Sequence, residues 1–262
     1  MQATEYLEGL VADWLSGSAF PAVPGQLRLA LSEANPGDDG AGFDEVTGGS
    51  YARQNITLTA PTTNEANGAV SSNTASIVFS GLPTTTATHV AIFDNAGTNM
   101  LLYGSLSAIR SVTAGDSISF AANVISVAFK GKYSKYLGEA IMNWLRGTSM
   151  PAAPASIKFE LSTVDPLRDA TGFTPPSGGA GYVAQTFEFG APQFVNGTGT
   201  SIANVDPIIF GPATASWGVV SHAAVYSVGG DMLLYGPLAV PKTVGNGEGM
   251  GFSAGSLSLL IR

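Results

Sequence analysis

The 262-residue chain contains no cysteine, and only 11% of its residues carry a charge. Without cysteine there can be no disulfide, no thiolate nucleophile and no cysteine-ligated metal. No apolar run approaches the roughly eighteen residues that a membrane-spanning helix needs. The first ten residues, MQATEYLEGL, are acidic where a secretory signal peptide would be basic. These absences predict a protein that is made in the cytosol and does not associate with membranes.

Positive charge is also scarce, because eleven Lys plus Arg stand against nineteen Asp plus Glu, a net charge of −8. Such a chain is repelled by the phosphate backbone, so nucleic acid is not an expected partner. In contrast, 45% of the residues are apolar. That fraction is enough for globular domains with buried cores.

The sequence repeats itself once along its whole length. YLEGLVADWLSGSAFPAVP at 6–24 returns as YLGEAIMNWLRGTSMPAAP at 136–154, and NMLLYGSL at 99–106 returns as DMLLYGPL at 231–238. A repeat of about 130 residues has the size of a complete domain and is much longer than a solenoid unit. The sequence therefore predicts a tandem duplication.

The two copies predict two separately folded domains, residues 1–130 and 131–262, divided near Gly131. Each copy should open with a helix, because apolar residues recur with a period of 3.6 over 6–15 and over 136–145. The expected end signals are the N-caps Thr4 and Ser134 and the left-handed glycines Gly17 and Gly147.

After each helix the pattern changes to short apolar or alternating segments separated by Gly, Pro, Asn, Asp and Ser. We therefore expect a mainly β protein of two tandem antiparallel β-sandwich or barrel-like domains, each with one N-terminal α-helix. Each helix should pack on the sheet of its own unit. The expected core residues are Trp14, Leu101, Leu102 and Tyr103 in the first unit and Trp144, Leu233, Leu234 and Tyr235 in the second.

No motif for catalysis, phosphate binding or metal binding is present. His89 and His222 occupy matching positions without acidic neighbours, so a structural role is expected for both. The acidic loop could hold a calcium ion weakly, although a solvated loop is the preferred interpretation; its carboxylates are Asp38, Asp39, Asp44 and Glu45. We expect no enzyme activity, no catalytic residue, no cofactor and no metal.

The order of elements resembles small virion structural proteins of tailed bacteriophages, of the tail-fibre, minor structural and head-decoration types. The resemblance depends on WLRG at 144–147, PAAP at 151–154, GGSYARQ at 48–54, ATASWGVVSHAAVY at 213–226, VTAGDSISF at 112–120 and MLLYG in both copies. It implies a non-enzymatic component of the virion, assembled in the host cytoplasm. Its partners would be other virion proteins, either the major capsid protein or tail proteins, in a homo-oligomer or in many lattice-bound copies.

Three functions stay open under this resemblance. A capsid decoration or cement protein is preferred, because the compact double domain lacks the long fibrous segments of a shaft. The alternative is a tail-fibre or tail-tip component involved in host attachment. A carbohydrate-binding module, or an accessory of a cell-envelope hydrolase, is the third.

The two copies differ most in charge. Residues 1–130 hold four Lys plus Arg against eleven Asp plus Glu, a net charge of −7, whereas 131–262 hold seven against eight, a net charge of −1. Because protein interfaces lose charged residues at their centres, we expect the second copy to make the larger partner contact and the first to turn its acidic loop to solvent. The candidate interface residues are Phe173, Pro175, Pro176, Tyr182, Phe194, Val195 and Ile202.

Overall fold

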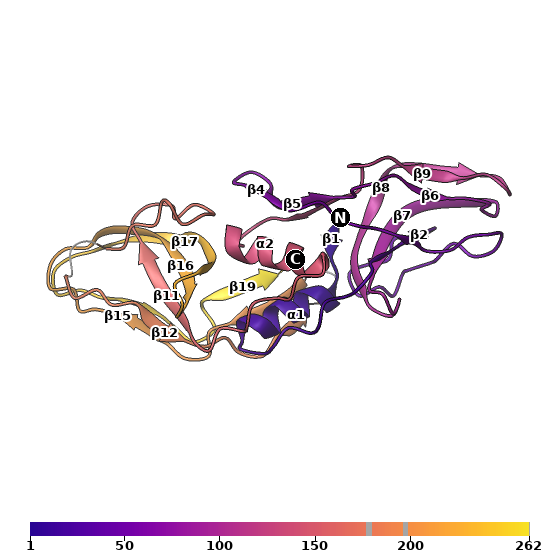
Figure 1. The fold of residues 1–262 in the computed structure, drawn as a ribbon. Helices are drawn as coiled ribbons and strands as arrows, with labels where there is room; N and C mark the ends of the chain where they lie inside the picture. The colour runs from indigo at the N-terminus through magenta and orange to yellow at the C-terminus, as the bar shows by residue number, and fades with distance from the viewer. Residues whose placement is uncertain (177–179, 196–198, 262) are drawn as a thin grey trace.

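The computed structural model describes residues 1–176, 180–195 and 199–261. It is mainly β, with two similar halves that each contain one helix, which confirms the expected fold class (Figure 1). The main sheet of the first half forms one lobe and the main sheet of the second half forms the other. The two helices lie between them, with β4 and β5 beside α2 and β19 beside α1.

The first half runs from residue 1 to the end of its last strand at Phe129. Its elements are β1 (Gln2–Ala3), α1 (Glu5–Leu15), β2 (Arg28–Ser32), β3 (Gln54–Asn55), β4 (Thr62–Asn64), β5 (Gly68–Ser72), β6 (Ile77–Phe79), β7 (Thr85–Phe93), β8 (Met100–Val112), β9 (Ile118–Phe120) and β10 (Ser126–Phe129).

The second half repeats this order. Its elements are α2 (Lys135–Leu145), β11 (Ile157–Ser162), β12 (Gln185–Phe187), β13 (Gln193–Val195), β14 (Gly199–Ala203), β15 (Ile208–Phe210), β16 (Gly218–Ser227), β17 (Met232–Val244), β18 (Met250–Phe252) and β19 (Ser258–Ile261).

Each half contains a main antiparallel sheet and a small one. The main sheets have the orders β1-β8-β7-β2-β3 and β12-β11-β16-β17, and the small ones have the orders β10-β5-β4 and β13-β14-β19. The pairs β6–β9 and β15–β18 complete the two halves. Every strand of the first half except the two-residue β1 therefore has a counterpart strand in the second half.

Both helices begin and end as the sequence predicts. Thr4 and Ser134 are the N-caps, and the hydroxyl of Ser134 accepts a hydrogen bond from the Leu137 amide at 3.1 Å. Gly17 and Gly147 follow the last turns with φ of 95° and 94°, a conformation that glycine adopts without strain.

The repeated MLLYG segment holds the start of each helix. Thr4 Oγ1 donates to the carbonyl of Met100 at 2.6 Å, and the Thr4 amide donates to Leu101 O at 3.1 Å. In the second half Ser134 Oγ donates to Met232 O in the same way, and its amide donates to Leu233 O at 3.0 Å. The repeated segment is thus a buried strand whose backbone carbonyls fix the N-cap of the preceding helix.

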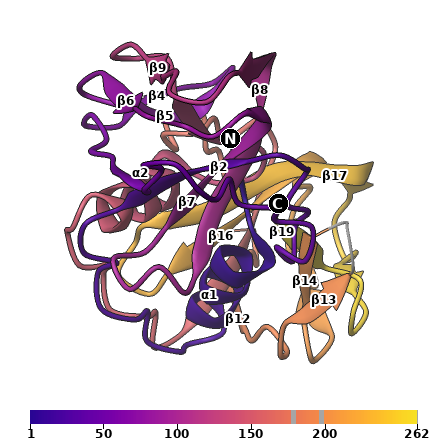
Figure 2. The same cartoon turned by 90° about the vertical axis from the view of Figure 1, so that its right-hand side faces the viewer.

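The bodies of the helices, however, pack on the opposite halves. Helix α1 lies against β14 and β19 of the second half, and α2 lies against β4 and β5 of the first (Figure 2). The expectation that each helix packs on its own sheet is therefore wrong. The apolar stripe indicates which face of a helix is buried, but it contains no information about which of two similar sheets covers that face.

The two tryptophans make the exchange reciprocal. Trp14 is 1% exposed, and its indole N–H donates to the carbonyl of Pro151 at 3.0 Å. Trp144 is 2% exposed and donates to the carbonyl of Pro21 at 3.1 Å, with the ring of Phe20 packed edge-on at 4.9 Å. One buried hydrophobic cluster consequently runs through both halves.

The contacts that the two helices make with the sheets of the opposite halves differ in chemistry. At Gly9 of α1 an added Cβ would lie 3.3 Å from the ring of Phe194, so that ring occupies the space of a side chain. The equivalent of Gly9 in α2 is Glu139, which accepts a hydrogen bond from the hydroxyl of Thr63 at 2.8 Å. Each helix therefore makes a contact with the opposite sheet that its counterpart does not make.

Replacing Trp14 with Ala should lower the free energy of unfolding by about 3–5 kcal/mol, because it removes a fully buried ring and leaves a cavity. Since that ring stabilises the contact between the halves, the whole chain should still unfold in one cooperative transition at a lower denaturant concentration. Equilibrium unfolding followed by far-UV circular dichroism and by fluorescence checks this. Two separate transitions, with only one of them shifted, would show that the halves are independent domains.

Candidate functional site

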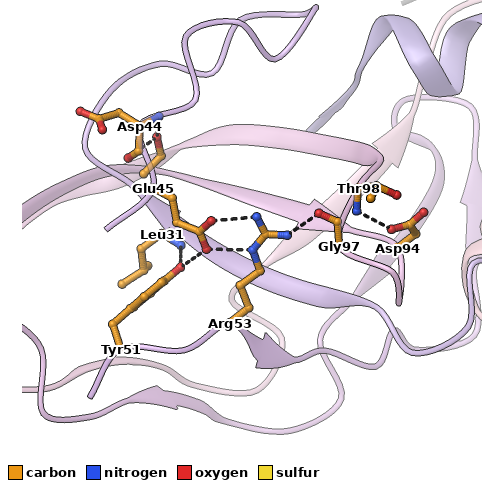
Figure 3. Close-up of polar contacts among 9 residues, drawn as sticks. Leu31, Asp44, Glu45, Tyr51, Arg53, Asp94, Gly97 and Thr98 are labelled. Atoms are coloured by element: carbon orange, nitrogen blue, oxygen red, sulfur yellow. Dashed lines mark hydrogen bonds and ion pairs between the residues drawn. The ribbon is translucent and has the colours of Figure 1, made fainter. Parts of the chain in front are cut away.

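A polar cluster in the first half is built around Arg53 (Figure 3). Its guanidinium makes two hydrogen bonds to the Glu45 carboxylate, from Nε at 2.8 Å and from Nη2 at 2.7 Å, and a third from Nη1 to the carbonyl of Gly97 at 2.9 Å. Tyr51 donates to Glu45 at 2.9 Å and accepts from the Leu31 amide at 3.1 Å. Within the described part of the chain this is the one ion pair, and it ties three loops to the main sheet.

Arg53 also lies over the ring of Phe93, with its Cζ 3.8 Å from the ring centre. The hydrogen bonds to Glu45 raise the pKa of Arg53, so its charge is permanent. The second half retains only the tyrosine, since Tyr182 accepts from the Leu161 amide at 2.7 Å and position 184 is Ala. We conclude that this cluster stabilises the first half and leaves no group of it free for chemistry.

The acidic loop does not form a cation site in the described residues. Glu45 is paired with Arg53, and Asp39 Oδ1 accepts from the Ala41 amide at 2.9 Å. Over residues 1–176, 180–195 and 199–261, no three His, Asp or Glu side chains come together in a group able to hold a metal ion. None of the helices in the same ranges is long and apolar enough to cross a membrane.

The two histidines are held by neighbouring hydroxyls. His89 Nδ1 lies 2.8 Å from Thr88 Oγ1, and His222 Nδ1 lies 2.9 Å from Ser221 Oγ. Both follow an irregularity in the pairing of the long strands, β7–β8 and β16–β17. Partial burial lowers the pKa of His89, which keeps that ring neutral. These contacts fit the structural role expected from the sequence.

Two of the candidate interface residues form an apolar surface on β13. Phe194 is 60% exposed and Val195 is 43% exposed, although both are large hydrophobic residues. Among the described residues, strand β13 is the outer strand of its sheet and is bonded to β14 alone. This combination of an unpaired strand edge and exposed apolar side chains makes β13 the best-placed part of the predicted interface.

The other candidates contribute to the fold of the second half. Ile202 is 1% exposed, so it belongs to the core. Its prediction as an interface residue is therefore wrong. Tyr182 is stacked on Phe210 at 5.8 Å, and Phe173 packs edge-on against Tyr226 at 5.3 Å. Of the two prolines in this loop, Pro175 is exposed and Pro176 is buried. Residues 177–179 and 196–198 of the predicted interface loops lie outside the described residues.

A hollow of about 900 Å³ opens in the first half beside the start of α1. Five of the residues that line it are Gln2, Ala3, Glu8, Asp38 and Tyr103. Glu8 is 1% exposed, and its Oε2 has no hydrogen-bond partner among the described residues. Thr200 of β14 lies within hydrogen-bonding reach of the carboxyl group, but a buried carboxyl oxygen without a partner is rare, and it marks this hollow as a candidate binding site.

The electrostatics around Glu8 favour its neutral form. Burial raises the pKa of Glu8 to about 8, and the nearby carboxylates of Asp38 and Glu5 add to the effect. The pKa of Asp38 is itself raised, by burial and then by Glu5 and Asp39. Two positive groups line the same hollow: the Met1 amine, which donates to Ser126 O at 2.9 Å, and Lys130, its charged neighbour.

Sequence reasoning missed Glu8 for a specific reason. It lies between Leu7 and Gly9 on α1, at the edge of the expected apolar stripe, where an acidic residue normally reaches solvent. Its burial depends on β14 of the other half, whose buried Thr200 lies next to it. The one signal in the sequence is that the second copy has Gly138 at this position.

Replacing Glu8 with Gln should stabilise the protein at alkaline pH. The folded-state pKa of about 8 lies above the ordinary value of 4.5, so the folded state binds a proton that the unfolded state releases, and stability falls as pH rises from about 4.5 to 8. The variant should lose this dependence and exceed the unmodified protein by roughly 2–4 kcal/mol at pH 9. Urea unfolding at several pH values measures it.

Asp13→Asn is the matched control, because Asp13 is an exposed carboxylate on the same helix. It should change the free energy of unfolding by less than about 0.5 kcal/mol at every pH. If Glu8→Gln has the same pH profile as the unmodified protein, the carboxyl of Glu8 does not titrate from a buried position.

With this geometry described, the comparisons with known proteins identify a family. A search of curated proteins finds no match to the chain. The family model of the podophage GP4 fiber I protein gp80 matches it twice, over residues 2–128 and over residues 132–260. The two matches correspond to the two copies of the repeat and together cover nearly the whole length. The chain therefore belongs to the Gp80 family, described as podophage GP4 fiber I protein gp80.

Proposed function

We propose that the protein is a non-enzymatic structural subunit of a podophage tail fibre, assembled with other proteins of the virion. The observation that carries the proposal is the double family match, because both halves of the chain resemble the same fibre protein. The capsid decoration favoured by the sequence has no comparable support. The tail-fibre alternative is now the better interpretation.

The geometry supports a structural subunit. The polar clusters described above have partners within the chain, as in the contacts of Glu45 with Arg53 and of each histidine with a neighbouring hydroxyl. The two lobes are joined by reciprocal helix contacts and share one hydrophobic cluster, with a main sheet at each end. A body of this kind suits a fibre, which must resist deformation while presenting surfaces to its neighbours.

The location of the protein on the particle tests the proposal. Purified virions labelled with gold-conjugated antibody against this chain should show gold at the tail and none on the head. Quantitative mass spectrometry should give a small copy number set by tail symmetry, far below that of the head lattice. Regular labelling of the head surface would overturn the fibre proposal and restore the decoration interpretation.

We further propose that β13 contacts a neighbouring virion protein through Phe194 and Val195. The support is their exposure on an outer strand and the low charge of the second half, since interface centres are poor in charged residues. An outer strand with free backbone groups can also accept a partner strand.

Replacing Phe194 with Ser should reduce incorporation of the protein into particles by about tenfold, because an aromatic anchor at an interface typically contributes more than about 1.4 kcal/mol. Because the ring also packs on Gly9 of α1, urea unfolding must first show that the variant stays folded. The control is Val240→Ser, which alters a valine that is 76% exposed on β17. Incorporation is measured by immunoblot of purified virions against total expressed protein. Equal incorporation of both variants would exclude β13 as the contact.

A further inference from the structure

The two halves place different side chains at one equivalent backbone position. The carbonyl of Arg168 accepts from the Lys135 amide at 2.8 Å, and the carbonyl of Asp38, 130 positions earlier, accepts from the Glu5 amide at 3.0 Å. Both residues therefore lie in equivalent loops, next to the first turn of the helix of their own half. Their charges are opposite.

In the second half the guanidinium of Arg168 fills the space beside the helix start. Arg168 is 5% exposed, and it donates to the carbonyls of Tyr133 and Gly131, the latter at 3.3 Å. Its Cζ lies 5.7 Å from the ring centre of Tyr235. The Glu65 side chain, from the other half, accepts from the Arg168 amide at 2.8 Å and from the Tyr235 hydroxyl at 3.2 Å. The chain thus already contains one built site for a guanidinium.

In the first half the corresponding space is the hollow beside Glu8. Tyr103 stands where the second half has Tyr235, and Ala3 stands where it has Tyr133, but Asp38 is too short to fill the space of Arg168. Glu8 replaces Gly138 and adds a second carboxyl group. One of the two tyrosines is therefore retained, while the guanidinium is replaced by two acidic groups.

We propose that this hollow receives the side chain of an arginine from a neighbouring protein, with the guanidinium between Glu8 and Asp38 and against the ring of Tyr103. Asp38 supplies a carboxylate, and Glu8, neutral in the free protein, would release its proton when the guanidinium binds; the planar fork of arginine matches carboxylate geometry. The unpartnered Oε2 of Glu8 would gain a donor. A metal ion fits less well, because no three ligands converge in the described residues.

That the neighbour is a virion protein rests on the proposed function, whereas recognition of a guanidinium does not. The experiment therefore uses a small probe, N-acetyl-argininamide, with the isosteric but uncharged N-acetyl-citrullinamide as its control. Both are titrated into the ¹⁵N-labelled full-length protein, and amide chemical shifts are followed by NMR. Argininamide should cause saturable shifts at Gln2, Ala3 and Tyr103, and citrullinamide should bind at least about tenfold more weakly.

Variants locate the binding. Glu8→Gln and Asp38→Asn should each weaken argininamide binding by about tenfold, because each removes a charge-assisted hydrogen bond. Asp38→Arg should abolish it, since it supplies the guanidinium from within, as the second half does. Asp13→Asn, on the outer face of α1, should bind as the unmodified protein does.

Three results would overturn the proposal. Equal shifts with citrullinamide would show that charge is not recognised. Unchanged affinity in Glu8→Gln and Asp38→Asn would show that the probe binds elsewhere. The absence of saturable shifts with argininamide would show that the hollow does not accept a guanidinium. A failure of this kind leaves the tail location of the protein unaffected, because that is measured separately on virions.

Discussion

The structure depends on one constraint, which is that each helix begins on one half and is buried by the other. The N-cap hydroxyls of Thr4 and Ser134 are bonded to the MLLYG strands of their own halves. A few residues later the same helices lie against the opposite small sheets, and the indoles of Trp14 and Trp144 close the contact. Separating the halves would expose both apolar stripes at once, so the burial of the two helices links the stability of one lobe to that of the other.

This exchange explains the differences that have accumulated between the two copies. Helix α1 must fit β14 and β19 as well as β1 and β8 of its own half, and α2 must fit β4 and β5 as well as β17 of its own half. Gly9 faces Phe194, whereas its counterpart Glu139 is bonded to Thr63. The paired changes are complementary across the halves, and neither pair would be complementary within one half.

Much of the fold can be predicted from the sequence, because local chemistry decides it. The helix ends depend on a hydroxyl at the N-cap and on a glycine that tolerates positive φ, and both lie in the chain itself at Thr4, Ser134, Gly17 and Gly147. The duplication and the mainly β character follow from direct repetition and from alternating apolar segments. The sheet that covers each helix cannot be predicted in this way, since two similar sheets offer similar surfaces to one stripe.

The candidate site could be predicted only in part, for the same physical reason. The exposed apolar pair on β13 could be predicted from the low charge of its loop. Ile202, which was predicted with it, is instead a core residue. The burial of Glu8 results from a contact between positions 192 residues apart in the chain, Glu8 and Thr200, and no local pattern encodes it. The ion pair of Glu45 with Arg53 likewise joins a loop predicted to be solvated to the edge of a sheet.

The difference between the two halves has a consequence for the orientation of the chain in an assembly. A pair of identical halves joined by exchanged helices would have two equivalent ends, and either end could attach to a given neighbour. Here the two halves differ, since the first has a net charge of −7 and the second has a net charge of −1. The chain is thus a near-symmetric body with polarity, and its two halves are not interchangeable in a contact with a neighbour.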